Sequence, residues 1–321
     1  MDTTNHNFTW ETFEFGGVNG SSYLNDIAII NENNIWAVGE IHTEDTDKFD
    51  SNGVWVQPYN VVHWDGVKWE LKRILINNYY YPLRTIYAFN ENDIWFANLS
   101  LIHWNGSDFS FYTTPPSDQG FGWSVNSIWG ASSHDFYIVG YGGNIVHYNG
   151  SSWRKIESGT ETDILDIYGS TNNLDKEKIF ASVSNRSGEG EKKILSIDEG
   201  NTVSSISWEL QTKVYSIWTP NGSVIYTAGS CIYSNKGSGG WSTFSMQLPS
   251  VLSRKIRGNG LNDIAVCGDF GLIGHFNGIN WNSYPELNLI DHQLFSIDVR
   301  SNLICIVGSN GRIATIVVGK N

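Results

Sequence analysis

Short apolar runs separated by polar turn residues extend along the whole chain, and no long run with helical spacing interrupts them. The clearest unit contains four runs in succession: VNSIWG (125–130), DFYIVG (135–140), NIVHYN (144–149) and SSWRKI (151–156). Runs of this length, rich in β-branched and aromatic residues and bounded by Gly, Asn and Ser, predict β-strands. Because every link between them is short, the four strands are expected to pair in chain order as an antiparallel sheet.

An Asn-Gly or Asp-Gly pair stands between the third and fourth strands of several such units. The pairs are Asp65-Gly66, Asn105-Gly106, Asn149-Gly150 and Asn277-Gly278. A type I′ turn needs positive φ at both central positions, which Gly and Asn adopt at low cost. Each pair therefore predicts a tight hairpin.

The four-strand unit recurs seven times, with first strands opening near Leu24, Leu83, Val125, Ile164, Val214, Ser253 and Leu294. The offsets between these positions are 59, 42, 39, 50, 39 and 41 residues. A period of about 40 residues with four strands per unit is typical of a β-propeller, whose blades bury their faces against one another. The sequence predicts an all-β, seven-bladed β-propeller of four-stranded antiparallel blades, a single domain over residues 1–321.

The last unit, residues 294–319, supplies three strands before the chain ends. The stretch NFTWETFEF (7–15) precedes the first unit and has the Trp-bearing character of a fourth strand. We expect it to be the outer strand of blade seven. The two ends of the chain would then close the ring and remove an open sheet edge.

The composition suits strands joined by tight turns and argues against one class of partner. Charged residues make up 17% of the chain, aromatic residues 14%, and the net charge is −13. Nucleic-acid phosphates demand a basic stripe that this chain lacks, so no nucleic-acid partner is expected. No apolar run approaches the roughly 18 residues of a membrane span, and the polar start MDTTNHNFTW does not resemble a signal peptide.

The three cysteines, Cys231, Cys267 and Cys305, lie in separate apolar runs. Their spacing matches neither a zinc site nor a disulfide framework. We expect small, buried core residues at these positions, and we expect no metal or other cofactor.

The unit SIWGASSHDFYIVGYGGNIVHYNGSSW (127–153) resembles the repeats of a broad group of bacterial seven-bladed β-propellers, often exported or surface proteins of unassigned function. It is more distantly similar to WD-repeat and sialidase propellers. The resemblance implies an exported location: periplasmic, cell-surface or secreted. It implies no sialidase activity, because HWDGVKW (63–69) places Asp and Gly side by side and does not reproduce the sialidase Asp-box.

Four histidines precede the Asn-Gly and Asp-Gly pairs: His63, His103, His147 and His275. In a propeller they lie on the third strands of different blades, too far apart to share one metal ion. We therefore expect each histidine to form a hydrogen bond inside its own blade. Candidate partners are polar first-strand residues such as Asp26, Thr85, Ser127 and Ser216.

Insertions interrupt the repeat in four places, at residues 40–60, 72–82, 113–123 and 184–193. Loops that join strands two and three, and loops that join one blade to the next, emerge on the same face of an up-and-down propeller. All four insertions are therefore expected on one face, opposite the Asn-Gly hairpins. Binding residues gather on such loops.

The first three insertions are neighbours around the ring and carry the candidate binding residues. These are Trp55, Tyr59, Tyr79, Tyr80, Tyr81, Phe121 and Trp123, beside Asp45, Asp47, Asp50 and Asp118. Exposed aromatic rings suit a protein or peptide partner, and with nearby carboxylates they also suit a glycan. Two other interpretations stay open: Tyr79 to Tyr81 cover the blade ends, or the acidic run 44–50 binds calcium, although Lys48 stands where a calcium loop needs an acid.

One residue near the start of each first strand is expected at the top of the central channel: Asn25, Arg84, Asn126, Leu165, Tyr215, Arg254 and Phe295. Arg84 and Arg254 are candidates for contact with an anion there. No spacing fixes a catalytic triad or carboxylate pair, although propeller enzymes assemble sites from separate blades. The sequence thus favours a non-enzymatic binding module for a protein or peptide, with a carbohydrate-binding propeller or a polysaccharide-active enzyme as alternatives.

Overall fold

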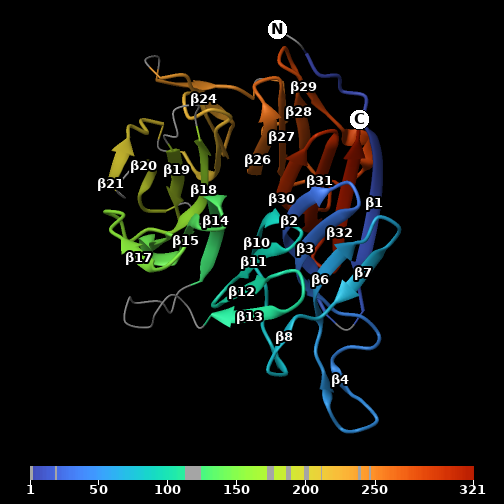
Figure 1. The fold of residues 1–321 in the computed structure, drawn as a ribbon. Coiled ribbons are helices and arrows are strands. Elements are labelled where there is room, and N and C mark those ends of the chain that lie inside the picture. Colours follow the sequence, from blue (N-terminus) through green and yellow to red (C-terminus); the bar gives the residue numbers. More distant parts are fainter. Residues whose placement is uncertain are drawn as a thin grey trace.

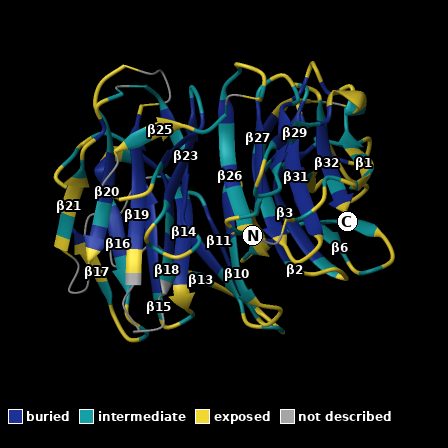
Figure 2. Cartoon of the chain, turned by 90° about the horizontal axis from the view of Figure 1, so that it is seen from above, coloured by how far each residue is buried: buried dark blue, intermediate teal, exposed yellow. Residues whose placement is uncertain are grey.

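Seven four-stranded antiparallel sheets surround a central channel in the computed structural model of this protein (Figure 1). The structure describes residues 3–18, 20–112, 124–171, 177–185, 189–198, 202–210, 212–237, 240–245 and 247–321. The predicted fold class, a seven-bladed β-propeller, is confirmed. Burial runs along the strands, whereas exposed residues gather in the turns at both ends of the blades (Figure 2).

The first four blades follow chain order from the channel outward. Blade one contains β2 (Tyr23–Asn31), β3 (Asn34–Ile41), β6 (Tyr59–Trp64) and β7 (Trp69–Lys72). Blade two contains β10 (Thr85–Asn90), β11 (Asp93–Ala97), β12 (Leu101–Trp104) and β13 (Phe109–Tyr112). Blade three contains β14 (Val125–Ser132), β15 (Asp135–Gly140), β16 (Ile145–Tyr148) and β17 (Trp153–Ile156). Blade four contains β18 (Ile164–Thr171), β19 (Glu177–Ser184), β20 (Lys192–Asp198) and β21 (Thr202–Ile206).

The remaining blades complete the ring. Blade five contains β22 (Val214–Trp218), β23 (Ile225–Gly229), β24 (Tyr233–Asn235) and β25 (Trp241–Thr243). Blade six contains β26 (Ser253–Gly260), β27 (Asp263–Gly268), β28 (Ile273–Phe276) and β29 (Trp281–Ser283). Blade seven contains β30 (Gln293–Arg300), β31 (Leu303–Ser309), β32 (Ile313–Lys320) and β1 (Thr9–Gly16).

Within the described residues, two small hairpins and two single-turn 3₁₀ helices lie outside the blades. The hairpins pair β4 (Lys48–Phe49) with β5 (Trp55–Val56), and β8 (Leu75–Ile76) with β9 (Tyr79–Tyr80). The helices are η2 (Tyr141–Gly143) and η3 (Pro285–Leu287). Among the described residues, no helix has the length and hydropathy that a membrane span requires.

The N-terminal strand closes the ring, as the sequence predicts. β1 pairs with β32 in antiparallel register from Thr9 opposite Lys320 to Gly16 opposite Ile313. Phe13 and Phe15 on β1 pack against the apolar core shared by blades seven and one. Backbone hydrogen bonds and buried apolar side chains therefore both stabilise the closed ring.

Aromatic residues of the first strands pack blade on blade. Trp129 and Trp218 are buried, and the ring of Tyr168 lies between them in sequence order at centroid distances of 6.3 and 6.4 Å. Gly169 makes this approach possible, because a Cβ there would lie 2.5 Å from the Trp129 ring. The first-strand aromatic residues Trp129, Tyr168 and Trp218 therefore serve the packing of blade on blade.

The four repeated histidines bond within their own blades, which confirms the expectation of a structural role. Each Nε2 lies 2.6 to 3.0 Å from a side-chain oxygen of the residue that opens the second strand: His63 with Asn34, His103 with Asp93, His147 with Asp135, and His275 with Asp263. The suggested partners on the first strand were wrong. Antiparallel order sets the third strand beside the second, out of reach of the first.

The polar first-strand residues instead join neighbouring blades. Asp26 accepts hydrogen bonds from the hydroxyls of Thr85 (2.7 Å) and Ser296 (2.6 Å), one in each adjacent blade. Asp166 likewise accepts from Ser127 at 3.0 Å and Ser216 at 2.6 Å. Two carboxylates therefore each hold three blades together at the channel wall.

Asp166 also receives two cations from blade six. Lys255 Nζ lies 2.8 Å from Asp166 Oδ1, and Arg257 forms a forked contact at 2.9 and 3.0 Å. Burial alone would raise the pKa of Asp166, but Arg257 and Lys255 hold it well below its ordinary range. The carboxylate is thus ionised in the folded protein and ties blade six to blade four.

Removing residues 1–16 should lower the free energy of unfolding by roughly 3 kcal/mol or more, because β1 loses its apolar contacts. The freed edge of β32 should also promote association of the chain. Thermal unfolding and size-exclusion chromatography measure both effects. Removal of residues 1–3 alone, which keeps β1, is the control, and equal behaviour of the two truncations would contradict the closure.

Asp166→Ala should lower the free energy of unfolding by about 3–5 kcal/mol, because it leaves Lys255 and Arg257 buried without their counter-charge. Denaturant titration at neutral pH measures the change. Asp198→Asn is the matched control, since Asp198 is exposed at the end of β20. A change under about 1 kcal/mol for Asp166→Ala would contradict the role of this carboxylate.

Candidate functional site

The described insertions of blade one, at residues 40–60 and 72–82, and the channel mouth share one face of the ring, here called the insertion face. Tyr23, at the start of β2, pairs with Glu40, near the end of β3. The loop that leaves β3 therefore emerges where the first strands begin. The Asn-Gly turns lie at the other ends of the blades, on the opposite face.

The β4–β5 hairpin projects from the ring of blades (Figure 1) and carries exposed aromatic residues at its tip. Phe49 is 67% exposed and Trp55 is 42% exposed. Their rings contact each other across the hairpin at a centroid distance of 5.2 Å. Val54 beside them is exposed as well, so the tip presents a small apolar surface to solvent.

A polar cluster anchors the base of this hairpin. Tyr59 donates its hydroxyl to Asp45 Oδ2 at 2.8 Å, and Arg73 lies 3.4 Å from the same oxygen. The Arg73 guanidinium also lies 3.6 Å from the centre of the Tyr59 ring. Hydrogen bonds from Thr43 and Tyr59, followed by Arg73, lower the pKa of Asp45 to about 2. Asp45 and Tyr59 therefore fix the hairpin and are engaged within the chain.

The carboxylates of Asp47 and Asp50 also form hydrogen bonds within the hairpin and the loop at its base. Asp47 Oδ2 lies 2.6 Å from His42 Nδ1 and accepts the Thr46 hydroxyl at 2.7 Å. Asp50 accepts the backbone N–H groups of Asn52 and Val54, both at 2.8 Å. Across the described parts of the chain, no group of three or more His, Cys, Asp and Glu side chains is placed to hold a metal ion.

The three consecutive tyrosines separate into different environments. Tyr79 is 69% exposed at the end of the β8–β9 hairpin. Tyr80 donates its hydroxyl to Glu40 at 3.0 Å, and burial raises its pKa. Tyr81 packs its ring 4.9 Å from Phe111. Tyr80 and Tyr81 thus cover the blade ends, whereas Tyr79 faces solvent.

Other predicted site residues fall outside the part of the chain that the structure describes. These are Asp118, Phe121 and Trp123, with the whole insertion 113–123. The fourth insertion, 184–193, is described only at its two ends.

The prediction from the sequence pattern did not include Phe49, Val54 and Leu75, which are exposed on the two hairpins. A signal for the first two was present, because Asn52-Gly53 stands between Phe49 and Val54-Trp55 as a hairpin turn would. Leu75 had no comparable signal. The β8–β9 turn is made by Asn77 and Asn78, both with positive φ.

All seven residues expected at the top of the channel line one cavity of about 280 Å³. Arg84 donates from Nη1 to Ser124 Oγ and to the Tyr141 hydroxyl, both at 3.1 Å. Arg254 donates from Nε to Asp269, and its guanidinium lies over the rings of Tyr215 and Phe295. The mouth therefore combines two oriented guanidinium groups with apolar walls.

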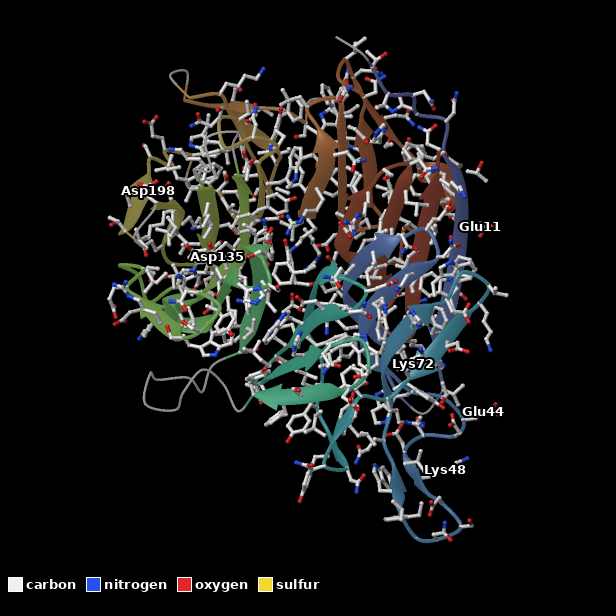
Figure 3. The ribbon with its side chains drawn as sticks, in the orientation of Figure 1. Glu11, Glu44, Lys48, Lys72, Asp135 and Asp198 are labelled. Atoms are coloured by element: carbon white, nitrogen blue, oxygen red, sulfur yellow. The ribbon has the colours of Figure 1, made fainter. Side chains whose placement is uncertain are left out.

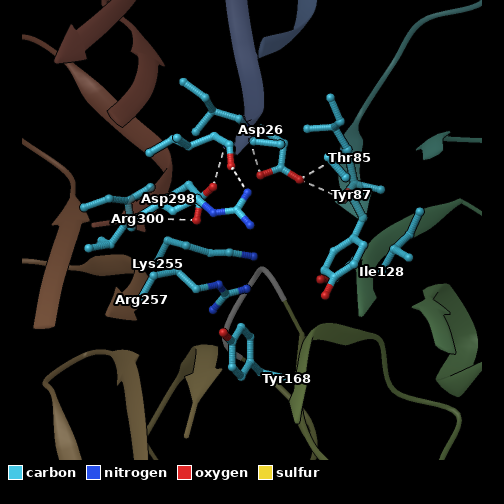
Figure 4. A pocket seen from close by; sticks show the side chains of 17 residues that line it. Asp26, Thr85, Tyr87, Ile128, Tyr168, Lys255, Arg257, Asp298 and Arg300 are labelled. Atoms are coloured by element: carbon cyan, nitrogen blue, oxygen red, sulfur yellow. Dashed lines mark hydrogen bonds between the residues drawn. The ribbon is translucent and has the colours of Figure 1, made fainter. Parts of the chain in front are cut away.

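A second cavity of about 240 Å³ lies deeper in the channel and is lined by charged side chains (Figure 4). They are Asp26, Lys255, Arg257, Asp298 and Arg300. Burial raises the pKa of Asp298, which accepts the backbone N–H groups of Ile29 and Val299. Most of these charged side chains form hydrogen bonds or ion pairs within the protein. The residues around the deeper cavity therefore serve to hold the blades together.

No known protein family matches the chain, and no curated protein matches it in sequence. Solved structures do share its fold. A structure of YCF48 bound to a D1 peptide is 15% identical, with 100% of this chain and 99% of that chain covered and a TM-score of 0.71. The WD40 β-propeller domain of Doa1 is 12% identical over 96% of this chain and 97% of that chain, with a TM-score of 0.65.

An enzyme also has this architecture. A catalytically inactive histidine-to-alanine variant of virginiamycin B lyase from Staphylococcus aureus, with quinupristin, is 13% identical. It covers 98% of this chain and 100% of that chain, with a TM-score of 0.69. At these identities the similarity shows the fold alone. None of the eight histidines of this chain lines the two channel cavities.

Tyr59→Phe should loosen the β4–β5 hairpin without unfolding the propeller, because it removes one anchor of Asp45. Amide hydrogen exchange should accelerate several-fold at Asp47 and Asp50, whose N–H groups donate to Val56 and Val54. Tyr112→Phe, a change at a partly exposed tyrosine of blade two, is the control. Unchanged exchange in Tyr59→Phe would contradict the anchoring role.

Proposed function

We propose that this protein is a non-catalytic binding propeller that holds a protein or peptide partner on the insertion face of blades one and two. The observation that carries the proposal is the pair Phe49 and Trp55, exposed together at the tip of an anchored hairpin. Aromatic residues dominate the binding energy of protein interfaces, and a hairpin that is already ordered loses little entropy on binding.

The anchoring explains why this tip suits recognition. Backbone pairing of Lys48 with Val56 and of Phe49 with Trp55 sets the hairpin register. Lys48 Nζ donates to the Glu44 carbonyl at 2.7 Å, and both side chains mark the projecting loop in Figure 3. The apolar tip is thus held away from the core of the propeller and does not pack against it.

The surrounding charge favours a partner segment that carries basic as well as apolar side chains. Glu44, Asp45 and Asp50 are exposed around the hairpin, in a chain whose net charge is −13. Acidic surface potentials attract basic segments and raise their association rate. Asp45 Oδ2 and Asp50 Oδ1 already accept hydrogen bonds within the loop, so these oxygens are less available to sugar hydroxyls, which favours a peptide over a glycan.

We further propose an exported location, on the strength of the resemblance to exported bacterial propellers. Two of the three thiols are compatible with it, because Cys267 and Cys305 are buried and burial raises the pKa of Cys267 to about 12, whereas Cys231 is half-buried. Buried thiols resist oxidation, since the thiolate is the reactive form. Fractionation of the native source tests the location.

Phe49→Ala combined with Trp55→Ala should weaken partner binding by at least about thirtyfold, as expected for interface anchors, with little change in the unfolding midpoint. Peptides are first selected on the wild-type protein from a displayed library, and their affinities are then measured by calorimetry. The matched control combines Val67→Ala with Ile279→Ala, two exposed apolar residues in the turns of the opposite face.

Equal affinities of the hairpin variant and the wild type would contradict the proposed binding surface. Saturable binding on a glycan array that is lost in the hairpin variant, without any selected peptide, would replace the peptide by a sugar. Conversion of an oligosaccharide by the purified protein would replace the binding function by catalysis.

A further inference from the structure

We propose that the channel mouth binds a carboxylate group that carries a neighbouring apolar side chain, with Arg84 as the principal contact. That the carboxylate belongs to a polypeptide rests on the proposed peptide-binding function. The channel mouth is then a second binding subsite on the same face. Its basis is the cavity of about 280 Å³ among the starts of the first strands.

Arg84 offers an unoccupied edge for a carboxylate. Its Nη1 donates to Ser124 Oγ and to the Tyr141 hydroxyl, which orients the guanidinium plane. The Nε and Nη2 groups have no hydrogen-bond partner among the described residues, and no described carboxylate forms an ion pair with Arg84. An Nε–Nη2 edge donates two parallel hydrogen bonds to one carboxylate, which makes this geometry selective.

The charges around the mouth leave Arg84 as the cation without a counter-charge in the described structure. Arg254 is paired with Asp269, and Lys255 is paired with Asp166. Asp26 also lines the mouth, but its two oxygens accept hydrogen bonds from Thr85, Ile86 and Ser296. Arg84 lies in a recess and forms no ion pair with any described carboxylate, so its guanidinium marks a place for an incoming anion.

Arg254 lies on the rim of the same cavity and supports this polarity. Its guanidinium is held by Asp269 through Nε, and the rings of Phe295 and Tyr215 lie 5.4 and 5.9 Å from it. The terminal nitrogens are therefore presented in a fixed orientation. Arg254, whose charge is paired with Asp269, adds oriented N–H donors beside Arg84.

The remaining residues that line the cavity determine which ligand groups can lie next to the carboxylate. Leu165, Tyr215 and Phe295 are apolar or aromatic, and Asn25 adds an amide whose nitrogen donates to the Leu83 carbonyl at 3.0 Å. The Asn25 side-chain oxygen has no donor among the described residues, so it can accept from an N–H group. A cavity of this size holds about one amino-acid residue, and a carboxylate, an apolar side chain and an N–H together describe the last residue of a polypeptide.

The test compares short synthetic peptides that lack Asp and Glu, as free acids and as C-terminal amides, by fluorescence anisotropy with the full chain. We expect the free acids to bind and amidation to weaken binding at least about tenfold. Arg84→Gln should cause a similar loss, and Arg84→Lys should recover part of it by restoring charge without the fork. Amidated peptides with an internal Glu show whether a side-chain carboxylate serves equally.

Arg312→Gln is the matched control, because Arg312 is exposed in the β31–β32 turn of the same face and the change alters net charge equally. Equal binding of acids and amides, or unchanged affinity in Arg84→Gln, would overturn the inference. So would the lack of saturable binding by every probe, including N-acetyl-leucine and N-acetyl-phenylalanine. Binding of amidated peptides that requires Phe49 and Trp55 but not Arg84 would leave the proposed function intact. It would contradict only the carboxylate site at the channel mouth.

Discussion

The structure depends on the closure of the ring, which backbone pairing between β1 and β32 achieves. Each blade buries its faces only against its neighbours, so an open ring would leave two blades half-covered. Once the ring is closed, seven first strands surround one channel, and their starts meet at one mouth. The inter-blade carboxylates Asp26 and Asp166 then fix the spacing of those strands.

This architecture gives the two faces of the ring different tasks. Turns built on Asn-Gly and Asp-Gly pairs are short and need only local chemistry, so one face is plain. The other face receives every connection that starts a blade or leaves a second strand, and length variation accumulates there. The exposed hairpin tip with Phe49 and Trp55 and the channel mouth with Arg84 are separate consequences of that geometry.

The repeat made the fold predictable, because turn chemistry, strand length and period all agree from unit to unit. The same regularity predicted which residues meet at the mouth, since equivalent positions in a closed ring must converge. It also predicted that the histidines are structural, but not their partners, because Asp93, Asp135 and Asp263 open second strands that the sequence places only within a residue or two.

Prediction was weakest in the insertions, where no repeat constrains the chain. Tyr59, Asp45 and Asp47 have the composition of a binding site, yet they bond to one another or to His42 and Arg73. Phe49 was overlooked, although its position beside the loop turn exposes it. Composition identifies residues capable of contact, whereas only the local hydrogen bonds decide which remain available.

Hydrogen exchange in the presence of a peptide selected on the wild-type protein shows which face of the ring binds a ligand. Binding on the insertion face should protect residues 47–56 and the starts of β2, β10 and β26, with no change in the turns 65–68, 105–108, 149–152 and 277–280. Protection confined to those turns would instead place the ligand on the opposite face and contradict binding on the insertion face.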